Sequence, residues 1–123
     1  MALPVGTWQI NISGVLGTLK LEAVAPDGTM DLILTIGSGA SATVVNSKGF
    51  WDEASQAITF FGVARVFKGF LFPTPPTPEP GQDVTWTLAG YVQAVPPPPP
   101  PSPIAWSARR NIFGWYAQFT QII

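Results

Sequence analysis

The side chains best suited to chemistry in this sequence are its tryptophans and one tyrosine. Aromatic rings that meet around one cavity bind flat or apolar molecules by stacking. The predicted ligand-binding set consists of Trp8, Trp51, Trp86, Tyr91, Trp106 and Trp115. The alternative is that these rings only fill a core, which is the commoner role of aromatic side chains in strands.

The groups that most enzymes use are scarce. The chain has no cysteine and no histidine, which removes thiolate chemistry, disulfides, the commonest general base and the commonest transition-metal ligand. Asp31, Asp52, Glu53 and Asp83 are the carboxylates nearest to predicted strand ends, and a carboxylate pair can do acid–base chemistry. Asp52 and Glu53, however, lie in a segment of turn composition, where we expect them to be solvated. The sequence therefore predicts a protein that is not an enzyme, with no metal site and no cofactor.

The composition indicates one small domain with an unusually apolar surface. The chain has 123 residues, of which 46% are hydrophobic and 11% are charged, against about 25% charged in an ordinary soluble domain. So few charges leave part of the outward surface apolar, and such a surface usually meets a partner, a ligand or a lipid. A net charge of −1 gives no electrostatic case for nucleic acid. We expect a single domain, residues 1–123, that does not bind nucleic acid.

No targeting or membrane-spanning segment is predicted. Residues 1–6 contain neither the basic nor the long apolar region of a signal peptide, which favours a cytoplasmic location. No stretch approaches the ~18 uninterrupted apolar residues of a membrane helix. A lipid-facing barrel is disfavoured because Lys20, Glu22 and Asp31 are predicted to face outward. We therefore expect no membrane partner.

Strand patterns run through the whole chain, and no amphipathic helical period is present. The turn sequence at residues 26–29, Pro-Asp-Gly-Thr, predicts a hairpin. The eight expected strands span residues 6–12, 17–25, 29–36, 43–51, 56–67, 82–95, 104–108 and 112–122. Because most links are short, consecutive strands should pair as an antiparallel up-and-down meander. Eight such strands can close into a barrel without exposed edges, so we expect an all-β barrel, with an open sandwich as the alternative.

Two proline-rich loops, residues 73–81 and 96–103, flank the strand expected at residues 82–95. Proline has no backbone N–H, so neither tract should join the interior of a sheet. Because the strand crosses the whole sheet, the two loops should emerge at opposite ends. Such tracts can be ligands for a polyproline-binding partner. The plainer interpretation is a stiff exposed loop, since no basic residue immediately flanks either tract.

Two of the expected strands, residues 56–67 and 112–122, are apolar on both faces. In a barrel only one face of a strand points inside, so the other face needs a cover. A homo-oligomer is the economical cover. The residues predicted at this interface are Phe61, Val63, Phe67, Phe113 and Phe119.

Short motifs in three strands resemble the calycin-type barrels, nearest to the avidin and streptavidin group. The motifs are Gly6-Thr7-Trp8, Thr85-Trp86 with Gly90-Tyr91, and Ile104-Ala105-Trp106. The resemblance implies an oligomerising barrel that binds a small ligand at its open end, with Trp86 and Trp106 as ligand contacts. It does not imply biotin binding, because Ile10 stands where that family has an asparagine for the biotin ureido group.

Two functions follow from these features, and an enzyme that uses a buried carboxylate is a distant third. The first is a non-enzymatic oligomeric barrel that binds a small apolar or planar ligand in an aromatic-lined cavity. The second is a structural or protein-interaction barrel with a filled core, which acts through its outer apolar faces and proline-rich loops. An empty interior would favour the first function, and a packed interior would favour the second.

Overall fold

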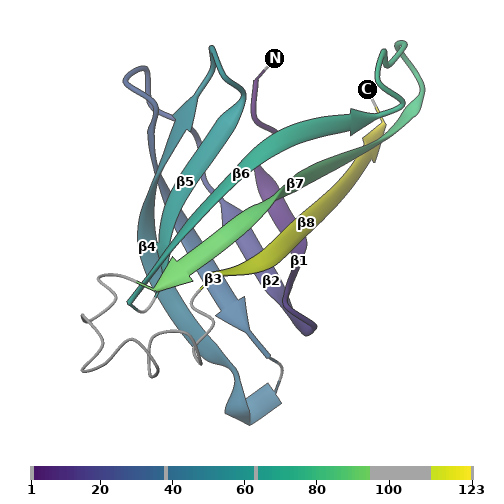
Figure 1. Ribbon diagram of the computed structural model, residues 1–123. Coiled ribbons are helices and arrows are strands. Elements are labelled where there is room, and N and C mark those ends of the chain that lie inside the picture. The colour runs from purple at the N-terminus through teal and green to yellow at the C-terminus, as the bar shows by residue number, and fades with distance from the viewer. Residues whose placement is uncertain (1, 38, 63, 95–111, 123) are drawn as a thin grey trace.

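The structure is a computed structural model that describes residues 2–37, 39–62, 64–94 and 112–122. The described residues form strands and one short 3-10 turn (Figure 1). The strands are β1 (Gly6–Ile12), β2 (Val15–Leu21), β3 (Thr29–Ile36), β4 (Thr43–Asp52), β5 (Ala57–Gly62), β6 (Arg65–Thr74), β7 (Asp83–Ala94) and β8 (Ile112–Ile122). The turn, η1 (Gly39–Ser41), lies between β3 and β4.

Each strand pairs antiparallel with the next, and the last strand returns to the first. Residues 9–12 of β1 pair with residues 115–118 of β8, which closes the barrel. The predicted all-β, eight-stranded, up-and-down barrel is confirmed, and the open sandwich is excluded. The predicted hairpin also forms, because β2 and β3 pair antiparallel on either side of the turn. Within the turn, the Thr29 hydroxyl and backbone N–H donate to Asp27 Oδ1 at 2.6 and 3.0 Å. These bonds, the hydroxyl bond foremost, lower the pKa of the Asp27 carboxyl.

The strand expected at residues 56–67 is wrong, because the chain turns in the middle of it. β5 ends at Gly62 and β6 begins at Arg65, and Ala64 between them has a φ of 52°. β6 then continues through Thr74, although residues 68–72 lie outside every strand expected above and residues 73 and 74 belong to the predicted first proline-rich loop. The strand expected at residues 104–108 lies outside the described residues. Eight strands are present among the described residues, as predicted, but two of them, β5 and β6, replace the single strand expected at residues 56–67.

Pro73 lies within β6, so the strand includes the first two residues of the predicted loop 73–81. The expectation that proline does not join the interior of a sheet still holds, because Pro73 lies at an edge. The last β6 residue in the β5 ladder is Phe70, and beyond it the Leu71 N–H still donates to the Gln56 carbonyl at 3.0 Å. Backbone groups alternate between the two neighbours of an antiparallel strand, so Pro73 also faces the β5 side, where no strand pairs with it. Its missing N–H therefore costs no ladder bond and leaves the edge without a donor.

Strands β6, β7 and β8 extend beyond the closed part of the barrel. Residues 71–74 of β6 and 119–122 of β8 pair only with β7. This three-stranded extension points to the upper right in Figure 1, at the end of the barrel that also holds both termini. The first proline-rich loop forms its tip, and Ala94 at the far end of β7 leads toward the second, which lies outside the described residues.

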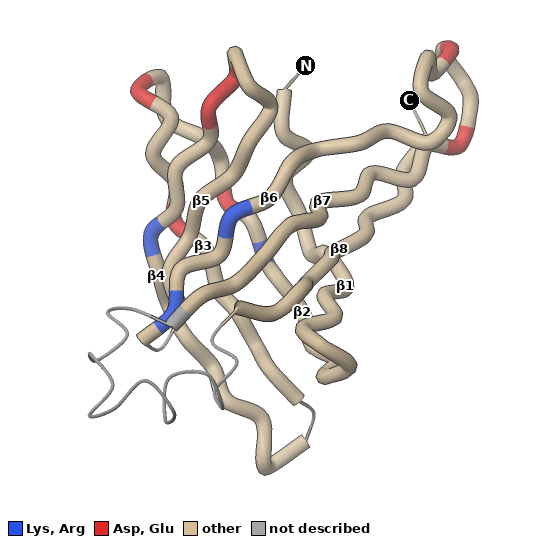
Figure 2. Tube along the Cα trace, in the orientation of Figure 1, with Lys and Arg blue, Asp and Glu red and all other residues tan. Residues whose placement is uncertain are grey.

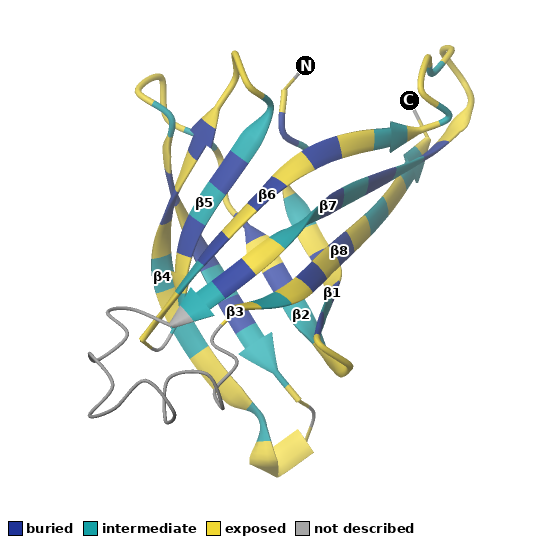
Figure 3. Cartoon of the chain, in the orientation of Figure 1, coloured by how far each residue is buried: buried dark blue, intermediate teal, exposed yellow. Residues whose placement is uncertain are grey.

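Buried and exposed residues alternate along the strands, as Figure 3 shows by its bands of dark blue and yellow. No polar or charged side chain is buried among the described residues. Three rings pack together in the core: Phe60 and Phe67 stack at 4.6 Å, and Trp115 meets both edge-on at 5.4 and 5.8 Å. Leu3, which precedes β1, is also buried in this core.

Candidate functional site

The four tryptophans that the structure describes all lie on the inner face of the barrel. Trp8, Trp51, Trp86 and Trp115 are each 6% exposed or less. No two of these four rings are in stacked or edge contact, so they do not form one aromatic box. Trp115 belongs to the central ring cluster, whereas Trp8 stacks on Phe119 at 5.5 Å. Trp106, a predicted ligand contact, lies outside the described residues.

Tyr91 lies on the outer surface and is 43% exposed. Its predicted place beside an interior ligand is therefore wrong. The physical reason is the period of a strand: Trp86 and Tyr91 are five residues apart on β7, so they must face opposite sides of the sheet. With Trp86 inside, Tyr91 has to be outside.

The predicted interface residues divide between the two surfaces of the barrel. Phe61 is 52% exposed, as expected, but Phe67 is 1% exposed and lies inside, so its predicted outer position is wrong. The turn after Gly62 starts a new alternation, which reverses the face that Phe67 occupies. Phe113 and Phe119 are also misplaced, because they share the inner face with Trp115 and pack against the core. Val63 lies outside the described residues.

Three of the four described indole N–H groups have a hydrogen-bond acceptor. Trp8 donates to the Pro4 carbonyl at 3.2 Å, and Trp51 donates to Glu53 Oε2 at 2.6 Å. Trp115 donates to two carbonyls, those of Lys68 and Tyr91, at 3.1 and 3.0 Å. The indole N–H of Trp86 is buried and has no acceptor. A buried donor without an acceptor is rare in folded proteins, since it costs about 1–3 kcal/mol.

The second surface that stands out is the outside of the β6–β7–β8 sheet. Four half-exposed aromatic side chains project from it, and we call them the outer aromatic face: Phe70, Phe72, Tyr91 and Tyr116. Ala89 on β7 pairs with both Phe70 and Tyr116, so the small alanine lies between the two rings. Tyr91 is opposite Gly114 in the next row of the sheet.

Sequence reasoning missed Phe70 and Phe72 although a signal for them existed. Residues 68–72 read Lys-Gly-Phe-Leu-Phe, which alternates as a strand does. Their nearness to the proline-rich loop obscured this alternation. Tyr116 lies on the outer face of β8, and only the pairing of the strands shows that it belongs to a patch that crosses three of them.

The carboxylates considered for catalysis are exposed, and three of them, Asp31, Asp52 and Glu53, form local hydrogen bonds or an ion pair. Asp52 accepts hydrogen bonds from the Ala54 N–H at 3.2 Å and from the Ser55 hydroxyl at 2.7 Å, which hold the β4–β5 turn. Asp31 is paired with the Lys48 ammonium on the outer surface. No group of three or more carboxylates that could hold a metal ion occurs in the part of the chain that the structure describes.

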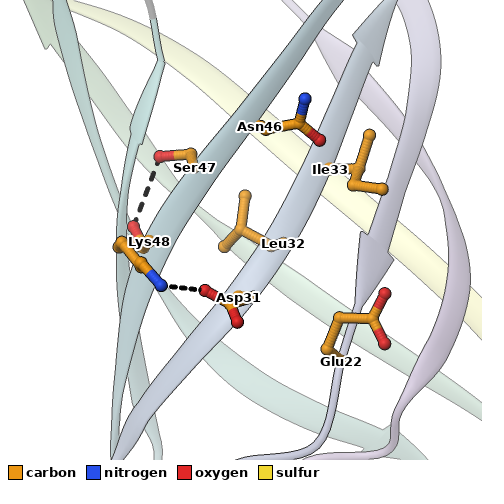
Figure 4. A pocket seen from close by; sticks show the side chains of 7 residues that line it. All are labelled: Glu22, Asp31, Leu32, Ile33, Asn46, Ser47 and Lys48. Carbon is orange, nitrogen blue, oxygen red and sulfur yellow. Dashed lines mark hydrogen bonds and ion pairs between the residues drawn. The ribbon is translucent and has the colours of Figure 1, made fainter.

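A shallow hollow of about 340 Å³ lies on the outside of β2, β3 and β4 (Figure 4). Its lining residues are Glu22, Asp31, Leu32, Ile33, Asn46, Ser47 and Lys48. The Lys48–Asp31 ion pair crosses one side of it, and the hollow is open to solvent. No buried polar group without a partner points into it, since Trp86 supplies the one such group among the described residues. We therefore assign no ligand to the hollow.

Comparisons of the chain with protein-family models, with curated proteins and with solved structures found no match. The eight-stranded antiparallel barrel is compatible with a calycin-like fold. Among the described residues, no helix has the length and apolar character needed to cross a membrane.

Proposed function

We propose that the protein is a non-enzymatic interaction barrel that associates with itself through the outer aromatic face. The observation that carries this proposal is the placement of four aromatic side chains on one side of three neighbouring strands. Phe70 and Phe72 are each 52% exposed, Tyr116 is 46% exposed and Tyr91 is 43% exposed. Contiguous apolar surface of this kind typically marks a protein–protein contact.

Covering this face would remove a large apolar area from water. An aromatic side chain buries roughly 150–250 Å² when fully covered, so a half-exposed ring leaves about 100 Å² in water. At about 25 cal/mol per Å², each ring then offers about 2 kcal/mol on burial. Phe61 and Ile112, at 52% and 46% exposure on the adjoining β5 and β8, enlarge the apolar area. The avidin-like resemblance, which implies association, agrees with this proposal.

The filled centre of the barrel favours this function over ligand binding as the principal one. Phe60, Phe67 and Trp115 pack against one another as a buried cluster. A barrel of eight strands is just wide enough for side chains to fill or for one small ligand. Rings packed together in this way support a core made of side chains over one that holds a central ligand.

Substitution of one aromatic residue tests the self-association. We expect the wild-type protein to sediment as an oligomer and Phe72→Lys to sediment as a monomer, because a charge in the middle of an apolar contact must be desolvated. Sedimentation velocity over a range of concentrations measures this. Val44→Lys is the matched control, since Val44 is 60% exposed on β4, outside this face, and should leave the oligomer intact. Wild-type protein that stays monomeric at millimolar concentration would contradict the proposal.

A second candidate function, small-ligand binding, is favoured by the Trp86 N–H that has no acceptor. Trp86 pairs on its two sides with Pro73 and Phe119, and Trp8 stacks on Phe119. These residues offer apolar surface beside one unused donor. The ligand that fits is a small planar molecule with a hydrogen-bond acceptor, which would enter at the end covered by Leu3.

The role of the Trp86 donor can be tested with two bicyclic compounds of similar size, of which one carries carbonyl acceptors and the other has none. We expect 1,4-naphthoquinone to quench tryptophan fluorescence and to bind about fivefold more tightly than naphthalene, because one net hydrogen bond contributes about 1 kcal/mol. In Trp86→Phe this preference should vanish, whereas Trp8→Phe should keep it. Equal affinity of the wild type for both compounds would remove the candidate.

A further inference from the structure

The outer aromatic face has opposite charges at its two ends. Lys68 lies on β6 at one end, and Glu79 and Asp83 lie in the β6–β7 connection and at the start of β7 at the other. Figure 2 shows this separation, with blue on β6 and red at the tip of the extension. None of these three side chains forms an ion pair with another described residue. The face therefore has charges that a partner with the reverse order could neutralise.

The ladder places these charges symmetrically about one row of the sheet. Lys68 is opposite Tyr91, which is eight positions along β7 from Asp83, or about 26 Å at about 3.3 Å per residue. The midpoint of these positions is Thr87, whose row also contains Phe72 and Gln118. We call this the central row.

We infer that two copies of the chain pack outer aromatic face to outer aromatic face, antiparallel, about a two-fold axis that lies in the interface along the central row. This inference rests on the proposed self-association and adds the order and the arrangement of the oligomer. In this arrangement, the end of the face that holds Lys68 and Tyr91 meets the end that holds Asp83 of the partner subunit. Stacked sheets pack about 10 Å apart with their strands within about 30° of each other, which permits this alignment.

The charges pair in this arrangement. Lys68 lies near Asp83 of the partner subunit, and the axis repeats the contact in the reverse direction. The interface thus forms two Lys68–Asp83 ion pairs from groups that have no ion-pair partner within the described chain.

The size of the side chains fits the same arrangement. Two positions to one side of the central row lies a row with two rings, Phe70 and Tyr116, separated by Ala89. Two positions to the other side lies a row of three threonines: Thr74, Thr85 and Thr120. The two-fold axis lays the bulky row of each copy on the threonine row of the other, which gives shape complementarity. Near the axis, Phe72 lies opposite Phe72 of the partner subunit.

The alternative two-fold axis runs along the strands and would align them parallel. That arrangement places Lys68 beside the end that holds Lys68 of the partner subunit, and Asp83 beside Asp83 of the partner subunit. Like charges at an interface are repulsive. It also lays the rings of one bulky row on those of the other. Both charge and size therefore favour the antiparallel arrangement.

A charge swap tests the predicted contact. We expect Lys68→Glu and Asp83→Lys each to weaken dimerisation about tenfold, since each places like charges together twice, and the double variant to return to within about threefold of the wild type. Lys48→Glu is the control, because Lys48 pairs with Asp31 on β3, outside this face. Sedimentation equilibrium at low salt gives the dissociation constants. If the double variant raises the dissociation constant by the product of the two single-variant factors, the two charges do not interact and the inference is overturned.

A distance measurement separates this inference from the proposed function. The chain has no cysteine, so Gln93→Cys provides one site for a spin label. In the antiparallel dimer two labels six positions beyond Thr87 lie about 40 Å apart, and in the parallel dimer about 10 Å. A dimer with the short distance overturns the arrangement and leaves self-association standing. A monomer in the same sample overturns both.

Discussion

Replacement of Trp115 by phenylalanine should lower the free energy of unfolding by about 2–4 kcal/mol. The ring is 3% exposed and packs edge-on against two stacked phenylalanines in the middle of the barrel. Phenylalanine is too small to fill the same space and leaves a cavity, which adds to the lost transfer energy. It also lacks the N–H that two carbonyls, of Lys68 and Tyr91, accept. Loss of that donor adds about 1–3 kcal/mol.

Trp86→Phe is the matched control for this prediction. It makes the same chemical change at another buried indole, but there the N–H has no acceptor to lose. We expect its cost to be smaller than that of Trp115→Phe by at least about 1 kcal/mol. Denaturation in guanidinium chloride followed by far-ultraviolet circular dichroism measures both. Equal losses would show that the two carbonyls beside Trp115 contribute nothing.

The fold could be predicted because its signals are local. Alternation along β1 and β3 and the turn at residues 26–29 specify strands and a hairpin without knowledge of the rest of the chain. Closure followed from short links between consecutive strands, which favour neighbours in sequence as neighbours in the sheet. These features needed only the identity of each residue and of the residues next to it.

The β5–β6 turn could not be predicted for the converse reason. Residues 58–67 are mostly apolar or β-branched, and the turn position Ala64 has no side chain that favours a φ of 52°. Asparagine or glycine usually marks such a turn. The adjacent Gly62 is the one local hint. Without this turn, Phe67 was predicted on the outer face instead of the inner one, and β6, which carries Phe70 and Phe72, was not recognised as a separate strand.

The candidate sites were predictable only as far as side-chain periodicity reaches. Periodicity groups Trp8 with Ile10 and Ile12 on one face and requires Tyr91 to face away from Trp86, but it does not say which of those two side chains points inside. It could not show which indole lacks an acceptor, because the acceptors of Trp8 and Trp115 are backbone carbonyls brought near by the pairing of strands. The charge order along β6 and β7 likewise depends on where β6 begins.

Glycines set the shape of the sheet on which Trp115 lies. Gly69 and Gly90 are opposite each other in β6 and β7, and Gly90 is also opposite Trp115 in β8. A Cβ on Gly69 would lie 2.7 Å from the Trp115 ring. The indole therefore occupies the space that a side chain at residue 69 would otherwise fill, and its N–H reaches the Lys68 and Tyr91 carbonyls. Ring, carbonyls and glycines form one unit.

Gly90→Ala should be the most disruptive single-methyl change in the barrel, with a loss of about 3 kcal/mol. The added Cβ would lie 1.9 Å from the Lys68 carbonyl oxygen and 2.6 Å from the Gly69 Cα. Both are backbone atoms, so β6 itself must move, and overpacking that forces backbone shifts costs about 1–3 kcal/mol or more. The moving carbonyl is also an acceptor of the Trp115 N–H, so the substitution strains the hydrogen bond as well as the strand.

Gly114→Ala provides the control, since a Cβ on this β8 residue meets nothing within 4 Å. Alanine loses less conformational entropy on folding than glycine, so we expect a change between zero and a gain of about 1 kcal/mol. Both variants should be compared in the Phe72→Lys background, because self-association would otherwise add a concentration-dependent term to the unfolding free energy. If Gly90→Ala unfolds at the same denaturant concentration as Gly114→Ala, the close approach of β6 to β7 cannot be a constraint on the barrel. If it unfolds earlier and Trp115 fluorescence shifts to the red in the native state, the glycine pair is what keeps the indole seated on the sheet.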